Sequence, residues 1–313
     1  MLRLLSLLGG KGVPLLFVGV FIGLLLPGLA NLLRPLLAPS VVLLLLFSLL
    51  RVDWQQVGTY LRRPLLTGGL VAWMLLASPV LTWAALAGVP LPSGLETAVI
   101  LMAAAPPILG ATAIALLLGL DGALTLVVGL ISTLLAPVTI PPLSLWLLGL
   151  DLAIGTGELM LRLGGVVLLA LLGALAIRAW LGSAWLRRNG VALDGMIVVI
   201  MLLFAVAIMD GVTETLLAQP AQVLLWLLAA FLANPALQAI TMLAFWGFGR
   251  RLAMSAGLLA GNCNMGLLLA TLSPDENFDV VLFFAIAQLP MFMLPAMMRP
   301  LYRRLLAPQQ AST

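Results

Sequence analysis

Histidine is absent from this sequence, and Cys263 is its only cysteine. The lack of histidine excludes catalytic triads that need an imidazole base, the HExxH metalloprotease motif and the usual zinc sites. A single cysteine cannot form an intrachain disulfide. These absences remove the commonest hydrolytic and structural-metal chemistries.

Charge is also scarce. Charged residues make up 8% of the chain and hydrophobic residues 63%, whereas a soluble domain is usually about one quarter charged. Most of the surface must therefore face hydrocarbon. The apolar runs are continuous rather than alternating, which predicts membrane-spanning helices instead of barrel strands. The net charge is +4, but the basic residues lie scattered beside apolar runs, so we expect a lipid bilayer and no nucleic acid as partner.

Ten apolar segments predict ten transmembrane helices in an all-α membrane protein. They cover residues 13–26, 35–50, 64–88, 95–120, 122–148, 159–181, 196–209, 217–248, 252–272 and 280–298. Ten helices of about 20 residues each, joined by short loops, fit a chain of this length.

The basic residues test this count, because cytoplasmic loops are enriched in Lys and Arg. With ten spans, 13 of the 15 basic residues fall on the side of the two termini. These are Arg3, Lys11, Arg51, Arg62, Arg63, Arg178, Arg187, Arg188, Arg250, Arg251, Arg299, Arg303 and Arg304. Only Arg34 and Arg162 fall on the opposite side. We therefore expect a multi-pass protein of the bacterial inner membrane with both termini in the cytoplasm.

Five spans in each half give the two halves opposite orientations in the membrane. Residues 1–150 would form the first inverted repeat, with helices one to five, and residues 151–313 the second, with helices six to ten. Inverted repeats of this kind are typical of secondary transporters.

Each half contains one span with helix-breaking residues near its middle. Pro106, Pro107 and Gly110 interrupt the fourth span, and Gly261 and Gly266 are the predicted break residues of the ninth. Matched breaks predict a transport site, because half-helix starts favour an anion and freed carbonyls favour a cation. Kinks that serve only helix packing are the alternative for either break taken alone.

The residues around both breaks resemble the bile acid:sodium symporter family. The similarity is clearest over residues 105–121, 132–137 and 261–267. The resemblance implies ten helices in two inverted five-helix repeats, with broken helices four and nine crossing in a core domain of spans three to five and eight to ten. The other spans would form a panel, and substrate would bind between panel and core.

The resemblance is weak at the family's sodium ligands. The family's span-four asparagine corresponds to Thr112 and its span-nine glutamate to Leu259. The other aligned positions are Met74, Thr125, Gly129, Cys263 and Asn264. Because Leu259 and Met74 supply no side-chain oxygen, we expect a sodium ion to bind weakly, through Thr112, Thr125 and Asn264, and we expect no other cofactor or metal.

Five polar or small side chains near the breaks are candidates to bind substrate: Thr112, Asn262, Cys263, Asn264 and Gln288. A buried amide or hydroxyl needs a hydrogen-bond partner, which a solute can supply. Capping of the broken helix by Asn262 and Asn264, and simple packing of Cys263, are the alternatives.

These features favour a secondary transporter of a small organic anion over an enzyme. An intramembrane aspartyl protease would need a GxGD motif, and Gly119-Leu120-Asp121 does not match it, because Leu120 precedes the aspartate. A facilitative or channel-like protein that keeps the fold and has lost ion coupling is the second hypothesis, and the missing sodium carboxylate is consistent with it.

Overall fold

The computed structural model describes residues 12–149, 155–272 and 278–306. Within these ranges the chain is helical, and the extended backbone pairs only at an isolated bridge between Pro107 and Cys263. Each of the ten predicted segments contains helix. Seven stretches are long and apolar enough to cross a membrane by length and composition. The segments outside those seven are the first, which is short, and the two that contain breaks.

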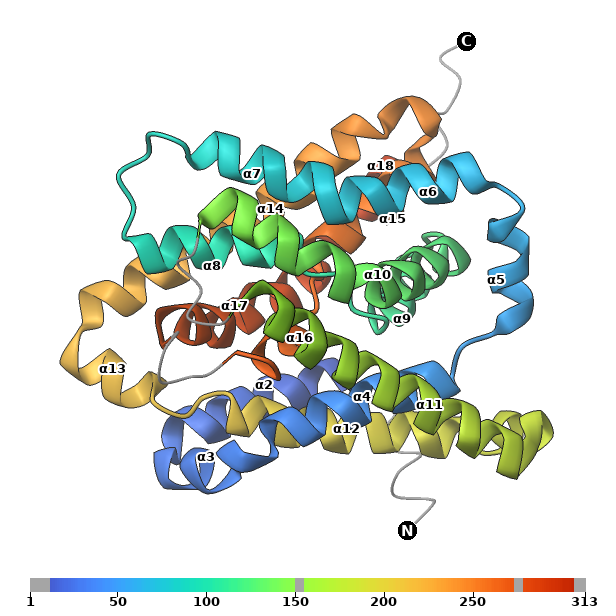
Figure 1. Cartoon of the computed structure of the whole chain (residues 1–313), viewed down its shortest axis with the longest axis horizontal. Coiled ribbons are helices and arrows are strands. Elements are labelled where there is room, and N and C mark those ends of the chain that lie inside the picture. Colours follow the sequence, from blue (N-terminus) through green and yellow to red (C-terminus); the bar gives the residue numbers. More distant parts are fainter. Residues whose placement is uncertain (1–11, 150–154, 273–277, 307–313) are drawn as a thin grey trace.

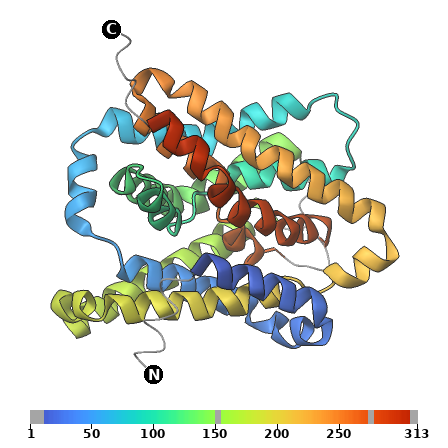
Figure 2. The same cartoon turned by 180° about the vertical axis from the view of Figure 1, so that it is seen from behind.

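Four helices form one layer: α2 (Gly12–Leu25), α4 (Leu37–Leu50), α11 (Thr156–Arg188) and α12 (Gly190–Ala207). In this four-helix layer, α12 packs between α2 and α4, and α4 packs between α12 and α11. The layer occupies the lower part of Figure 1, and Figure 2 shows α2 and α12 side by side from behind. Helices from the two halves of the sequence therefore alternate across the layer.

The main bundle packs against this layer and fills the upper part of Figure 1. It contains α6 (Pro64–Ala72), η2 (Trp73–Ala77), α7 (Ser78–Leu86), α8 (Ser93–Ala104), α9 (Ala111–Leu117), α10 (Gly122–Leu148), α14 (Pro220–Ala244), η3 (Trp246–Phe248), α15 (Arg250–Gly261), α16 (Met265–Leu269), α17 (Phe278–Met297) and α18 (Arg299–Leu306). The connectors are α3 (Pro27–Leu33), η1 (Arg34–Leu36), α5 (Trp54–Leu61) and α13 (Val212–Ala218).

Several helix boundaries differ from those predicted. The sixth span ends at Arg188 rather than Leu181, with an interruption at Gly182, whose φ of +76° is outside the helical region. The final turns carry Arg187 and Arg188, and cations stabilise the negative end of a helix. The second apolar stretch begins at Pro27 rather than at residue 35, so it includes α3. Hydropathy does not predict α5 or α18, because these helices are short and rich in polar residues.

Two glycines spaced four residues apart bring α2 into close contact with α12. A Cβ atom on Gly19 would lie 2.9 Å from Leu202 Cδ1, and one on Gly23 would lie 2.7 Å from the Met209 Cβ and the Val206 carbonyl oxygen. Small residues at this spacing let helix backbones approach one another in membranes, where packing replaces the hydrophobic effect between helices.

We expect Gly23→Leu to destabilise the four-helix layer. The added side chain would meet the backbone of α12, which cannot move aside as a flexible side chain could, and overpacking of this kind costs about 1–3 kcal/mol. Thermal unfolding in detergent measures the effect. Gly28→Leu is the matched control, because nothing lies within 4 Å of a Cβ at Gly28. Equal melting temperatures for the two variants would contradict the close contact.

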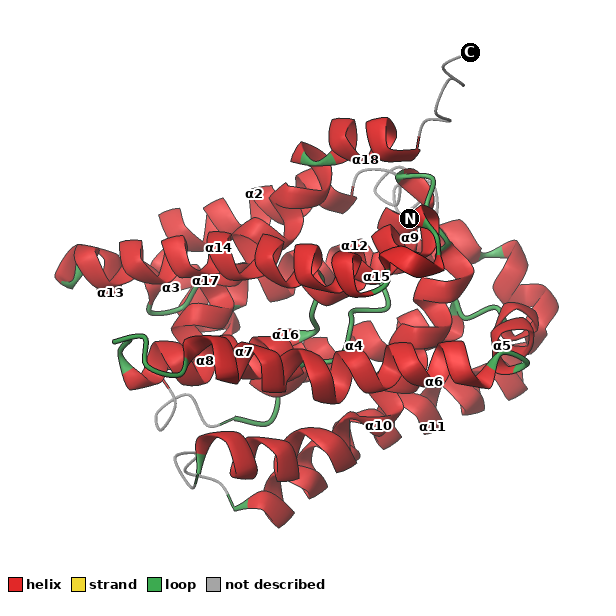
Figure 3. Ribbon diagram, turned by 90° about the horizontal axis from the view of Figure 1, so that it is seen from above, coloured by secondary structure: helices red, strands yellow, loops and turns green. Residues whose placement is uncertain are grey.

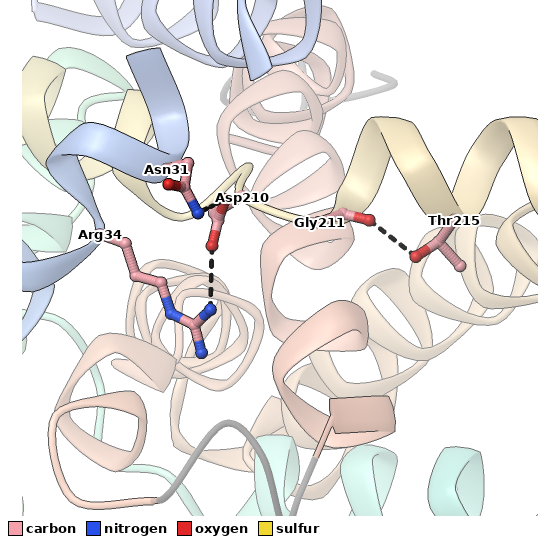
Figure 4. Close-up of polar contacts among 5 residues, drawn as sticks. All are labelled: Asn31, Arg34, Asp210, Gly211 and Thr215. Carbon is pink, nitrogen blue, oxygen red and sulfur yellow. Dashed lines mark hydrogen bonds and ion pairs between the residues drawn. The ribbon is translucent and has the colours of Figure 1, made fainter. Parts of the chain in front are cut away.

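Ion pairs at the two ends of α4 join it to α12 and to the turn that follows α12. At one end, Asp210 accepts hydrogen bonds from Asn31 Nδ2 at 3.2 Å and from Arg34 Nη1 at 3.3 Å (Figure 4). At the other end, Arg51 donates through Nε at 2.7 Å and Nη2 at 3.1 Å to the two carboxylate oxygens of Asp194. Such bidentate geometry fixes orientation as well as distance. These contacts hold α4 and α12 together at both ends.

Candidate functional site

The first break separates α8 from α9 at residues 105–110. Ala105, with ψ of 137°, is extended, because a residue before proline is sterically disfavoured in the helical region. Pro106 and Pro107 have no N–H groups to continue the helix. The predicted break therefore lies where the two prolines place it.

The second break separates α15 from α16 and is narrower than predicted. Asn262, Cys263 and Asn264 form it, whereas Gly261 ends α15 and Gly266 lies inside α16. The assignment of Gly261 and Gly266 as break residues is therefore wrong. Both glycines instead allow close packing. A Cβ at Gly261 would lie 2.4 Å from Gln238 Cγ, and one at Gly266 would lie 3.3 Å from Phe204 Cζ.

The two breaks meet and satisfy each other's backbone groups. The Ile108 N–H donates to the Asn262 carbonyl at 2.8 Å, and the Asn264 N–H donates to the Pro106 carbonyl at 2.7 Å. Figure 3 shows loop segments in the middle of the molecule near α15 and α16. Backbone groups freed inside a bilayer need such partners. This pairing explains how two broken helices persist in an apolar interior.

Side chains at the second break are largely used to cap it. Asn264 accepts a hydrogen bond from the Leu267 N–H at 3.3 Å, and Asn262 Nδ2 donates to the Leu258 carbonyl at 2.7 Å. Cys263 Sγ lies 3.0 Å from the Ala260 carbonyl oxygen. The Oδ1 atom of Asn262 is buried and has no partner among the described residues.

A buried chain of hydrogen bonds supports the break from the side of α14. Asn234 Nδ2 donates to the Gly261 carbonyl at 2.6 Å, and Gln238 Nε2 donates to Asn234 Oδ1 at 2.7 Å. Tyr302 on α18 donates through its hydroxyl to Gln238 Oε1 at 3.0 Å. Asn234 is fully buried. The network thus connects α18, at the end of the described chain, with the last residue of α15.

The α9–α10 turn is anchored separately, next to α5 and α15. Asp121 caps α10 by accepting from the Leu124 N–H at 3.0 Å, and its own N–H donates to Ser255 Oγ at 3.0 Å. The Tyr60 hydroxyl donates to the Asp121 carboxylate. Burial, and then the hydrogen bond to Asp121, raises the pKa of Tyr60 to about 12. Tyr60 is therefore a neutral donor at physiological pH.

A cavity of about 80 Å³ lies between the two breaks and the four-helix layer. Its lining comes from α4, the first break, α12, the second break with α16, and α17. These residues are Val41, Leu44, Leu45, Ser48, Ile108, Leu109, Gly110, Ile197, Met201, Phe204, Cys263, Asn264, Met265, Gly266, Gln288, Met291 and Phe292. The lining carries no charged side chain.

The structure brings together three of the five predicted substrate residues. Cys263, Asn264 and Gln288 line the cavity, whereas Thr112 and Asn262 do not. Gln288 is buried and donates through Nε2 to the Phe284 carbonyl at 3.1 Å. The Thr112 hydroxyl oxygen on α9 is buried without a partner among the described residues.

Sequence reasoning missed the residues that α4 and α12 contribute to the cavity. Phe204 and Met201 belong to a uniformly apolar run, so no local signal distinguishes them. Ser48 is the one exception, because its hydroxyl interrupts the apolar run of α4. A polar residue inside an otherwise apolar span is a recognised sign of an internal surface.

Of the three predicted cation ligands, only Asn264 lines the cavity. Thr125 is buried on α10, where its hydroxyl donates to the Gly122 carbonyl at 2.9 Å. Neither Thr112 nor Thr125 lines the cavity that contains Asn264. Leu259 and Met74 are buried apolar side chains. Within the described ranges, no three acidic, histidine or cysteine residues lie close enough to hold a metal ion.

The comparison with known protein families agrees with the expectation from the breaks. None of the curated proteins matches the chain. Residues 38–220 match the sodium bile acid symporter family. The matched region covers more than half of the chain and includes the first break and most of the four-helix layer. The chain is therefore a multi-pass membrane protein that belongs to the sodium bile acid symporter family, whose members are transporters.

Proposed function

We propose that this chain is a secondary transporter that moves a small organic anion by alternating access through the cavity between its breaks and its four-helix layer. The observation that carries the proposal is the meeting of two broken helices beside a cavity that also touches α4 and α12. Paired broken helices are the typical binding element of secondary transporters.

The proposed architecture is two inverted five-helix repeats, residues 1–150 and 151–313, with both termini in the cytoplasm. The helix order α2, α12, α4, α11 supports it. The equivalent helices of the two halves are α2 with α11 and α4 with α12. Exchanging each with its equivalent reverses the order, which is what a pseudo-two-fold axis between the halves requires. The inner membrane of a bacterium is the proposed location, and the distribution of basic residues supports the cytoplasmic termini.

The size of the cavity restricts the proposed mechanism. Drug-sized ligands occupy pockets of about 300–1,000 Å³, and the cavity here has about 80 Å³. A solute larger than a few atoms therefore requires movement of the four-helix layer relative to the main bundle. Because ion pairs join α4 to α12, and close packing joins α2 to α12 and α11 to α4, we propose that the layer moves as a unit.

The solute would be recognised by polar side chains rather than by charge. Ser48, Asn264 and Gln288 place hydroxyl and amide groups at the cavity, and most of the remaining lining is apolar. Such a surface suits an amphipathic anion whose polar end reaches the amides and whose apolar part contacts α4 and α12. Comparing the binding of such an anion with the binding of an uncharged analogue separates recognition of charge from recognition of shape.

We predict that solute binding depends on sodium more weakly than is typical of the symporter family. The aligned positions Leu259 and Met74 offer no oxygen, and coupling cannot exceed the ion's differential affinity for the two states of the carrier. Solute binding measured in sodium and in choline at equal ionic strength should differ by less than tenfold. A gain of tenfold or more from sodium, equivalent to about 1.4 kcal/mol of coupling, would contradict the prediction.

The second hypothesis is a facilitative protein that has lost ion coupling, and the lack of side-chain oxygens at Leu259 and Met74 is consistent with it. A carrier without a coupling ion would equilibrate its solute and would not accumulate it. Counterflow in proteoliposomes, with and without a sodium gradient, distinguishes these cases. Solute accumulation driven by a sodium gradient would exclude the facilitative hypothesis, and solute exchange without accumulation would support it.

A thermal-shift screen of the purified protein against small organic anions tests the proposed function. A solute at 100 times its Kd should stabilise the protein by about 2.7 kcal/mol. Stabilising anions should then exchange across proteoliposome membranes. If no stabilising anion is transported, the proposal fails.

A further inference from the structure

The two half-helices that follow the breaks differ in burial. All residues of α16, Met265–Leu269, are buried, whereas Ala113, Leu116 and Leu117 of α9 are exposed. α16 packs against α4 and α11 of the four-helix layer, while α9 packs mainly on α10 and α15 within the main bundle. In the proposed inverted repeat these half-helices are equivalent. From their different packing against the four-helix layer we infer which route to the cavity is closed.

One arginine connects the closed half-helix to the four-helix layer. Arg162 on α11 donates through Nη1 to the Thr271 carbonyl, just after α16, at 3.0 Å. Its Nη2 atom pairs with Glu158, one turn earlier on α11. Among the described residues, the bond to Thr271 is the only side-chain hydrogen bond between the layer and the main bundle.

The equivalent carbonyl of the other half-helix has a different kind of partner. Leu120, after α9, accepts a hydrogen bond from Arg251 Nη2 at 3.2 Å. Arg251 lies on α15, inside the main bundle, so this bond does not hold α9 to the layer. A guanidinium stabilises the negative end of a helix in both cases, but only Arg162 does so across the boundary that must open during transport.

We propose that Arg162 is a latch that closes the outer route to the cavity by holding the end of α16 against the four-helix layer. The inference rests on the proposed function, and the distribution of basic residues assigns this end of α16 to the outer face. Arg162 is a positioning residue, since it does not line the cavity. The structure is then the inward-facing state, in which α9 packs mainly on α10 and α15 of the main bundle.

The single native cysteine allows a direct test. Cys263 lines the cavity, so its reaction with a small, membrane-impermeant methanethiosulfonate reports which face has access. Labelling rates are compared in spheroplasts, which expose the outer face, and in inside-out vesicles. Wild-type protein should react faster from the inner face. Arg162→Met should raise the outer-face rate roughly fivefold, because it removes a partly exposed, charge-assisted hydrogen bond.

A matched control separates the latch from a general role of charge on α11. Arg178 is on the same helix and also donates to a backbone carbonyl, that of Val52, at 3.4 Å through Nη1. Because Val52 belongs to a connector, Arg178→Met should leave the ratio of outer to inner labelling unchanged. The Arg162 side chain is 41% exposed, so its replacement leaves no buried hole. If Arg162→Met does not fold, Arg162→Gln removes the same bond and carries the same expectation.

Three results would overturn the latch: faster labelling of wild-type protein from the outer face, no rise in outer labelling after replacement of Arg162, or an equal rise in Arg178→Met. Labelling needs no solute. A failed search for transported anions therefore rejects the proposed function while the labelling data still accept or reject the latch.

Discussion

Gly110→Phe is expected to abolish solute binding and transport while leaving the protein folded. Gly110 lines the cavity and has an ordinary φ of −61°. A Cβ there would meet only side-chain atoms of Ile108, at 3.9 and 4.0 Å. The new Cβ therefore meets no backbone atom, and we expect the aromatic ring to compete with solute for a cavity of about 80 Å³.

The affinity of any solute that stabilises wild-type protein should fall by at least about tenfold, or 1.4 kcal/mol. Titrations followed by thermal shift, and exchange in proteoliposomes, measure the two losses. Gly68→Phe on α6 is the matched control, because Gly68 is exposed and nothing lies within 4 Å of a Cβ there. Unchanged affinity in a folded Gly110→Phe protein would show that solute binds elsewhere.

Asn234→Leu is expected to cause the largest loss of stability. Leucine has the same branching and number of side-chain heavy atoms but leaves two buried partners without hydrogen bonds, the Gly261 carbonyl and the Gln238 amide. Each unsatisfied buried group costs about 1–3 kcal/mol, so the combined cost should be about 2–4 kcal/mol after partial relaxation. Chemical unfolding in detergent measures it.

Tyr302→Phe is the graded comparison within the same network. It removes only the last donor, to Gln238 Oε1, so its effect should be about 1 kcal/mol. The double variant should lose less than the sum of the two, since the partners belong to one network. Strict additivity, or an Asn234→Leu protein as stable as wild type, would show that the hydrogen bonds do not act together.

The helices and the two interruptions could be predicted because each depends on local chemistry. Continuous apolar runs mark the spans, and consecutive prolines at Pro106 and Pro107 cannot continue a helix. The second break was harder to delimit. Its glycines suggested a wider interruption, but Gly261 and Gly266 remain helical because their role is close approach to Gln238 and Phe204.

The candidate site was only partly predictable, since it depends on contacts between distant segments. The pairing of Ile108 with Asn262 through backbone atoms leaves no trace in side-chain identity. The faces of α4 and α12 that line the cavity are apolar, as are the faces that contact lipid, so composition cannot tell them apart. Position near the breaks predicts Thr112 and Asn262 as site residues, yet neither lines the cavity.

The central claim is that solute occupies the cavity at the two breaks, and protection of Cys263 tests it most directly. Labelling of wild-type protein by the impermeant thiol reagent is followed in inside-out vesicles, with and without a stabilising anion found in the thermal-shift screen. Because Cys263 lines the cavity, a solute at 10 times its Kd should slow labelling by about tenfold if bound protein does not react. An unchanged labelling rate at that concentration would contradict the account.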